Sequence, residues 1–219
     1  MKKRLIWFIL FGIAFGFIEA AVVVYLRKLY YPSGFSFPVI IAASDIARVE
    51  ILREIATIIL IWSAAELTAG SRLVKLAAFS IIFAVWDIFY YIFLKMVLGW
   101  PESLFTWDIL FLIPYPWAGP VWAPVVISLG LIYGGVALLW ADERNQALVL
   151  SMKFWFLEIL MGIGIIVTFL IPGRAVINQT MPEYFPWYFF WPCFIIGLAV
   201  FIHAQFQARS AADNTPADR

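Results

Sequence analysis

The chain has 219 residues, of which 64% are hydrophobic and only 13% are charged, and its formal net charge is +1. A soluble domain carries roughly a quarter charged residues, so this composition and a mean hydropathy of +0.94 predict an all-α, polytopic integral membrane protein. No basic tract accompanies the near-neutral charge, which excludes nucleic acid as a partner. The single cysteine, Cys193, excludes an intramolecular disulfide and a cysteine-rich metal site.

Apolar runs of about 20 residues, the length that crosses a bilayer, recur along the chain. We predict one transmembrane helical domain over residues 1–209. Its spans are expected near 5–26, 50–68, 74–97, 119–140, 154–172 and 186–205.

Two further hydrophobic segments, 35–43 and 109–117, are short and contain proline. We expect both to be interfacial or re-entrant on the outer side, since proline removes a backbone donor. A spanning form of 35–43 would move the C-terminus across the membrane. Residues 210–219 are polar and without apolar periodicity, which predicts a disordered cytoplasmic tail.

The distribution of positive charge predicts the orientation. Most of the fifteen Lys and Arg residues fall on the side of the two termini. The positive-inside rule therefore predicts a multi-pass protein of the cell inner (plasma) membrane with both termini in the cytoplasm. Trp and Tyr gather on the opposite, outer side. An interfacial aromatic belt accounts for many of them, and we expect the others to wall a vestibule that opens outward.

Glu19 lies inside the first predicted span, where an ionisable group costs at least about 2.5 kcal/mol. It shares a helical face with Gly12 and Gly16, a G-x-x-x-G pair that favours close helix contact. Glu19 is therefore expected to face the bundle interior. Arg27, at the outer end of the same face, lies about 12 Å away along the axis.

Asp87 repeats this arrangement in the third predicted span. Tyr91 and Lys95 follow it on one face, and Lys95 extends to the outer interface. The two carboxylates, Glu19 and Asp87, are thus predicted at similar depth in the outer half of the membrane. We take Glu19, Asp87 and Tyr91 as candidate catalytic residues.

The residues expected to bind a substrate around these carboxylates carry charges or aromatic rings. They are Arg27, Glu50, Arg53, Glu54, Trp86, Tyr90, Lys95, Trp107, Asp108 and Trp117. Glu50, Arg53 and Glu54 open the second span, where they form either counter-charges over the site or a solvated helix start with local ion pairs.

The proline-rich stretch from 99 to 120 is the most unusual local sequence. Pro101 suits a first helical turn and Pro114 ends a helix, so a short half-helix is expected there, with Asp108 aimed at the vestibule. The alternative is a structured interfacial loop that caps the bundle.

The inventory of reactive residues excludes several chemistries. The one histidine, His203, cannot supply paired haem ligands or a three-histidine zinc site. Nucleotide-binding and hydrolase motifs are absent from the sequence. We therefore predict no cofactor and no metal site.

Three functions remain open. In the first, the protein binds or transports a small solute with proton or cation coupling at Glu19 and Asp87, with Arg53 or Arg27 balancing the charge. A buried carboxyl group holds its proton more readily than one in water, which favours proton coupling. The chain is short for a transporter, so a homodimer is expected.

The second function is that of an intramembrane enzyme acting on a lipid or isoprenoid substrate. One carboxyl group would act as acid and the other as base, while aromatic rings such as Trp86 and Tyr90 stabilise positive charge. The third is that of a non-catalytic complex subunit or assembly factor. There Glu19, Arg27, Asp87 and Lys95 pair with one another and only fix helix packing.

Overall fold

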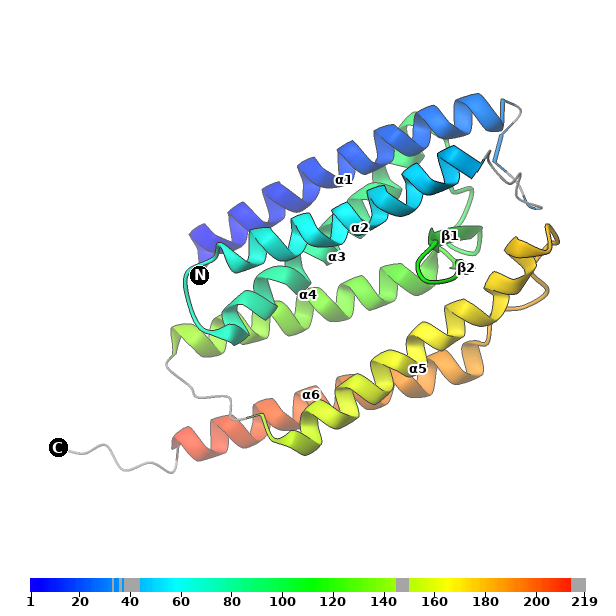
Figure 1. The fold of residues 1–219 in the computed structure, drawn as a ribbon. Coiled ribbons are helices and arrows are strands. Elements are labelled where there is room, and N and C mark those ends of the chain that lie inside the picture. The colour runs from blue at the N-terminus through cyan, green and yellow to red at the C-terminus, as the bar shows by residue number, and fades with distance from the viewer. Residues whose placement is uncertain (33, 36, 38–43, 145–149, 214–219) are drawn as a thin grey trace.

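The computed structural model describes residues 1–32, 34, 35, 37, 44–144 and 150–213. Helices make up 76% of it. The elements in chain order are α1 (Lys2–Tyr30), α2 (Ser44–Glu66), α3 (Arg72–Leu98), β1 (Trp107–Phe111), β2 (Trp117–Pro120), α4 (Trp122–Glu143), α5 (Met152–Ile177) and α6 (Trp187–Asp213) (Figure 1). All six helices run along one common direction, with the two strands at one end of the bundle, here called the hairpin end.

Each of the six predicted spans overlaps one helix. Five of these helices, all except α2, are long and apolar enough to cross a membrane. Helix α2 falls short in apolar character because Glu50, Arg53 and Glu54 lie within it. The architecture is thus of the multi-pass helical membrane type, and the crossing of α2 stays a prediction.

Helix α3 is the centre of the larger helix group, because it packs against α1, α2 and α4. Its fully buried side chains include Val74, Ile81 and Ile82, which contact a core contributed by all four helices. The glycine pair of α1 lies in this interface: a Cβ on Gly16 would stand 2.9 Å from the carbonyl oxygen of Trp86. The close helix contact predicted for Gly12 and Gly16 is confirmed, and α3 is the partner.

Helices α5 and α6 form a second, antiparallel pair beside this group (Figure 1). The pair joins the rest of the molecule mainly through β2. A Cβ on Gly173 of α5 would fall 1.8 Å from the carbonyl oxygen of Pro116, so the connection between the strands rests directly on the helix backbone.

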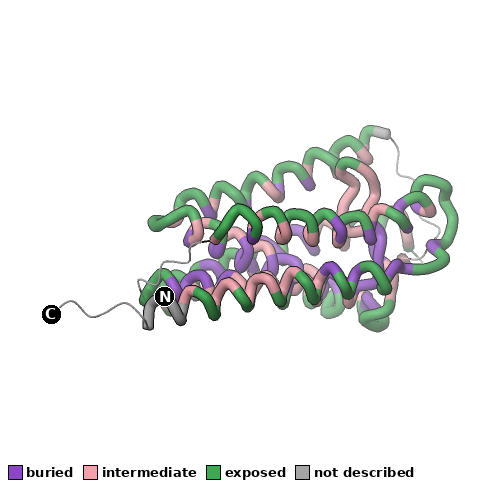
Figure 2. Tube along the Cα trace, turned by 90° about the horizontal axis from the view of Figure 1, so that it is seen from below, coloured by how far each residue is buried: buried purple, intermediate pink, exposed green. Residues whose placement is uncertain are grey.

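The outward sides of the helices carry large apolar residues that have no protein neighbours to cover them. Leu29, Leu52 and Phe156 are each more than 60% exposed. Figure 2 shows exposed residues along the outer sides of the helices and buried residues toward the middle. Such a surface suits a hydrocarbon environment, because in water apolar patches of this extent mark a site that a partner or a membrane covers.

The half-helix predicted between Pro101 and Pro114 is wrong. Strands β1 and β2 pair antiparallel there, with Asp108 opposite Gly119 and an irregularity between Ile109 and Phe111. The segment 109–117 is thus part of a two-stranded hairpin. Pro114 and Pro116 lie in the connection between the strands, where no ladder amide is needed, and Pro120 is the last residue of β2. These positions are compatible with a hairpin.

The end of α1 and the start of α2 lie together at the hairpin end (Figure 1). Most of the predicted interfacial segment 35–43 is outside the described residues. Helix α6 continues to Asp213, four residues into the predicted disordered tail, and residues 214–219 are not described.

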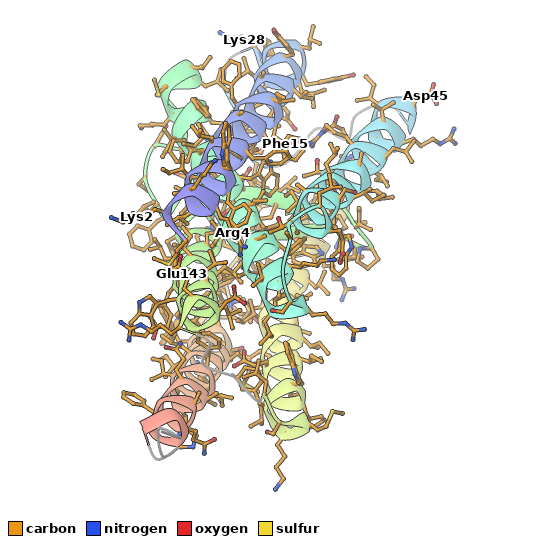
Figure 3. The ribbon with its side chains drawn as sticks, turned by 90° about the vertical axis from the view of Figure 1, so that its left-hand side faces the viewer. Lys2, Arg4, Phe15, Lys28, Asp45 and Glu143 are labelled. Atoms are coloured by element: carbon orange, nitrogen blue, oxygen red, sulfur yellow. The ribbon has the colours of Figure 1, made fainter. Side chains whose placement is uncertain are left out.

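The start of α1 and the end of α6 lie at the end of the bundle opposite the hairpin (Figure 1). The amino group of Met1 pairs with the carboxylate of Glu143, and Nη1 of Arg4 lies 3.7 Å from Oδ2 of Asp142. Arg4 and Glu143 accordingly lie near each other in Figure 3. These contacts hold the start of α1 against the end of α4.

Candidate functional site

A cavity of about 380 Å³ opens between α1, α2, α3 and β1 toward the hairpin end. We call it the polar cavity. Ten of the thirteen site residues predicted from the sequence line it. They are Glu19, Arg27, Glu50, Arg53, Glu54, Trp86, Asp87, Tyr90, Tyr91 and Asp108.

Glu19 is held by two groups of α2. Its Oε2 accepts from the guanidinium of Arg53, and its Oε1 accepts from the hydroxyl of Thr57 at 2.6 Å. Arg53 also donates to Glu50 through Nε at 3.0 Å and Nη2 at 2.9 Å. The guanidinium of Arg53 therefore binds two carboxylates. With Glu50 it forms a local i,i+3 ion pair, and for Glu19 it is a counter-charge, so each of the two arrangements considered for the start of α2 is found in part.

Glu54, on the same helix, accepts a hydrogen bond from the backbone amide of Leu112 at 2.8 Å. This contact ties the residue after β1 to α2. Glu54 is buried, and among the described residues no cationic group lies within ion-pairing distance of it.

Asp87 is buried and accepts from the hydroxyl of Ser128 on α4 at 2.8 Å. It faces the polar cavity on one side and a second, larger cavity on the other. Glu19 and Asp87 thus reach one cavity from different helices, as the sequence predicted, but each has its own partner.

Arg27 connects α1 to the hairpin. Its Nη2 donates to Oδ1 of Asp108 at 3.1 Å, and both side chains are over 90% buried. The guanidinium also lies 3.5 Å from the ring centroid of Trp100 and 4.2 Å from that of Phe35. Burial raises the pKa of Asp108, while the charge of Arg27 and the nearby Tyr91 hydroxyl work against the rise.

The second cavity, here called the apolar cleft, has a volume of about 510 Å³ and lies between α3, α4, α5 and α6. Among the described residues that line it, Asp87 and Glu158 are the charged ones. Leu110 and Phe111 of β1 line both cavities, so the strand forms part of the wall between them. The hairpin therefore contributes to the polar cavity through Asp108 and to the cleft through Trp117.

Three predicted site residues do not reach the polar cavity. Lys95 donates to the carbonyl oxygens of Gly99 at 3.0 Å and Pro101 at 2.7 Å. Trp107 packs against Phe185, with 6.5 Å between ring centroids. Trp117 lines the apolar cleft instead.

The pairing proposed for a purely structural role is also wrong. Glu19 forms its ion pair with Arg53, and Arg27 forms its ion pair with Asp108. Asp87 accepts from Ser128, and Lys95 donates to backbone carbonyl oxygens. Each of the four residues expected to pair together has its partner outside that set.

Sequence reasoning missed Thr57, Ser128 and Trp100. Thr57 follows Arg53 by four residues and so shares its face, a signal that was available. Ser128 stands alone in an apolar helix, and its partner on α3 depends on helix rotation, which the sequence does not reveal.

No protein-family model, curated protein or solved structure matches this chain. The geometry of the polar cavity and the apolar cleft is therefore the basis for a functional interpretation.

Proposed function

We propose that this is a multi-pass membrane protein that binds a small, positively charged solute in the polar cavity and exchanges it against protons, as a transporter would. The observation that carries this proposal is the charge balance of the lining: among the described residues, five carboxyl groups face two guanidiniums. Arg53 and Arg27 compensate Glu19 and Asp108, which leaves an excess of acid around Glu50, Glu54 and Asp87.

An excess of buried carboxylates is costly unless protons or a cation neutralise it. Unpaired charge in a low-dielectric region costs several kcal/mol, and groups in such places bind a counter-ion or change protonation state. In the described part of the chain, the donors to Glu54 and Asp87 are neutral: the amide of Leu112 and the hydroxyl of Ser128. These two carboxyl groups are the proposed exchange sites.

The chemistry of the walls favours an organic cation. Among the described residues, no group of three or more His, Cys, Asp or Glu converges to hold a metal ion. Trp86, Tyr90 and Tyr91 line the cavity, and aromatic faces attract ammonium groups. The volume of about 380 Å³ lies within the range of small-molecule pockets, roughly 300–1,000 Å³.

Calorimetry on the purified protein in nanodiscs tests the proposal, with ethanolamine and choline as probes. Titrations in two buffers of different ionisation enthalpy give the number of protons released per cation bound. We expect proton release in the wild type, and weaker binding with less release in Glu54→Gln and Asp87→Asn. In proteoliposomes that contain a pH-sensitive dye, an ethanolamine gradient is expected to drive proton flux.

Glu66→Gln is the matched control, because Glu66 pairs with Lys75 at the opposite end of the bundle and is exposed. It removes the same charge without touching the cavity and should bind like the wild type. Equal binding and equal proton release in wild type, Glu54→Gln and Asp87→Asn would contradict the proposal.

A second candidate is acid–base chemistry on a lipid. The observation in its favour is the unequal surroundings of two carboxyl groups in one cavity: Glu19 has the guanidinium of Arg53, whereas Asp87 has the hydroxyl of Ser128. Such pairs divide into an ionised and a protonated partner. Turnover of a radiolabelled phospholipid that stops in both Glu19→Gln and Asp87→Asn, without proton-coupled flux, would favour the enzyme.

A further inference from the structure

The two cavities are neighbours that share part of their lining. Asp87 on α3 and Leu110 and Phe111 on β1 face both. The hydroxyl of Ser128, which donates to Asp87, lies on the cleft side. A molecule with a polar head and an apolar chain can therefore place its head in the polar cavity and its chain in the apolar cleft, with the junction between them at Asp87.

The polar cavity also holds donors that lack an acceptor. Nη1 of Arg27 and Nε1 of Trp86 are buried and have no hydrogen-bond partner among the described residues. Leaving a buried donor unsatisfied costs about 1–3 kcal/mol. An occupant of this cavity is thus expected to bring acceptor oxygens for these donors as well as positive charge for the excess carboxylates.

The apolar cleft has the shape and chemistry for a hydrocarbon chain. Along α5 the lining beyond Glu158 extends to Phe169, which at 1.5 Å per residue corresponds to about 16 Å. That length exceeds half of the ~30 Å hydrocarbon core of a bilayer. A Cβ on Gly162 would meet no atom of the described residues within 4 Å, so the cleft is open beside α5.

The junction supplies a further donor. Nε1 of Trp117 is buried and without a partner in the described part of the chain, and its ring lies 5.5 Å from that of Phe111. A carbonyl oxygen between head and chain, as in an ester or amide, would satisfy this donor.

We propose that the polar cavity and the apolar cleft are one binding site for an amphiphile: a zwitterionic head, with an ammonium group and acceptor oxygens, occupies the cavity, and a single hydrocarbon chain occupies the cleft. This inference rests on the proposed function and names the ligand class of the same site. A single-chain phospholipid and an acylated amino compound share this chemistry.

Native mass spectrometry of the delipidated protein tests the inference with four probes. These are palmitoyl lysophosphatidylethanolamine, the lysophosphatidylglycerol of the same chain, O-phosphoethanolamine and palmitate. We expect the zwitterionic lysolipid to bind at least tenfold more tightly than the anionic lysolipid, the head alone or the chain alone. A fifth probe, Nα-palmitoyl lysine, also carries an ammonium group, a carboxylate and one chain. Whether it or lysophosphatidylethanolamine binds more tightly distinguishes an acylated amine from a phospholipid source.

Gly162→Phe fills the cleft and should weaken lysophosphatidylethanolamine binding at least tenfold while leaving ethanolamine binding unchanged. Gly162→Ala is the matched control and should bind both like the wild type. A diazirine near the end of the lysolipid chain provides a measurement on the unaltered protein. We expect it to label Ile165 and Leu198, which line the cleft and are only partly exposed, rather than Ile163, which is 53% exposed.

The outcomes separate the two proposals. Ethanolamine binding that depends on Glu54 and Asp87, combined with no preference for the lysolipid or with labelling of Ile163, overturns the amphiphile site and leaves the cation site standing. If neither ethanolamine nor lysophosphatidylethanolamine binds more weakly to Glu54→Gln and Asp87→Asn than to the wild type, the cation site is overturned. Tight lysolipid binding that Gly162→Phe does not change also overturns the inference, because the chain then lies elsewhere.

Discussion

The guanidinium of Arg53 on α2 donates to the carboxylate of Glu19 on α1, across the wall of the polar cavity. Both helices pack on α3, so this ion pair joins two neighbours of the central helix. Glu19 is 5% and Arg53 is 23% exposed. The free energy lost when this pair is broken should therefore lie between that of exposed pairs, up to ~1 kcal/mol, and that of buried pairs, ~3–5 kcal/mol.

Removing one member of this pair should destabilise the protein more than removing both. Of the partners that the structure describes, Arg53→Gln leaves Glu19 the hydroxyl of Thr57, and Glu19→Gln leaves Arg53 the carboxylate of Glu50. We expect each single change to lower the melting temperature, and the double change to recover part of the loss. Thermal unfolding in one detergent at one pH measures the three variants.

Lys75→Gln is the control for this cycle, because Lys75 and Glu66 form an exposed pair at the other end of the bundle. Lys75→Gln should lower the melting temperature only slightly. If the losses from Glu19→Gln and Arg53→Gln simply add in the double variant, the two residues are not coupled and the pair does not join α1 to α2.

Asp108 should give the stability of the protein a dependence on pH. Burial raises the pKa of its carboxyl group above the usual 3.8, although Arg27 and Tyr91 oppose the rise. The folded state then holds the proton more tightly than the unfolded state. The contribution of Asp108 is therefore fully present below pH 3.8 and is lost as the pH rises through the higher folded value.

Asp108→Asn removes this titration. We expect the wild type to lose stability relative to Asp108→Asn as the pH rises from below 4 toward neutrality, in melting temperatures taken at fixed ionic strength. Asp45→Asn, which removes an exposed carboxylate at the start of α2, is the matched charge control. A wild type that gains stability over Asp108→Asn with rising pH would show that the pair with Arg27 outweighs burial.

The helices could be predicted from the sequence, because a run of about 20 apolar residues has few alternatives to a helix. The hairpin could not. Each strand has five residues or fewer, and the connection between them, 112–116, contains no Asn-Gly or Asp-Gly pair of the kind that marks a hairpin. Pro101 and Pro114 suit both the ends of a helix and the edges of a strand, so the local sequence does not decide between them.

The site was predicted to the extent that it depends on helix faces. Glu19, Asp87 and Tyr91 face one cavity because three- and four-residue spacing fixes which residues share a face. Lys95 shares that face too, but it lies one turn further along and folds onto the carbonyls after α3. Partners such as Ser128 depend on which helices are neighbours, and the sequence does not contain that information in local form.

Gly173 should not tolerate a larger residue. A Cβ there would lie 1.8 Å from the carbonyl oxygen of Pro116, a backbone atom that can move only with the hairpin. We expect Gly173→Ala to lower stability by about 1–3 kcal/mol, the usual cost of overpacking. Limited proteolysis of the connection between β1 and β2 should be faster, because the hairpin is displaced from α5.

Gly134→Ala is the matched change for Gly173→Ala, since its nearest neighbour, the ring of Phe201, lies at an ordinary 3.8 Å. Alanine favours a helix over glycine by up to about 1 kcal/mol, so this variant should be as stable as the wild type or more so. Equal proteolysis of both variants and the wild type would mean that the hairpin does not rest on α5.

Gly16 sets the distance between α1 and α3, and through it the width of the polar cavity. A Cβ at this position would lie 2.9 Å from the carbonyl oxygen of Trp86 and 3.3 Å from the amide nitrogen of Tyr90, both on α3. Gly16→Leu must therefore move α1 away from the helix that carries Asp87. Because α1 carries Glu19, we expect a lower melting temperature together with weaker ethanolamine binding.

Gly162→Leu is the control for Gly16→Leu, because a Cβ at Gly162 has no atom of the described residues within 4 Å. This variant should keep both the melting temperature and ethanolamine binding near the wild-type values. A Gly16→Leu protein that melts lower but binds ethanolamine normally would show that the cation is held by α2 and α3 without α1, and would remove Glu19 from the site.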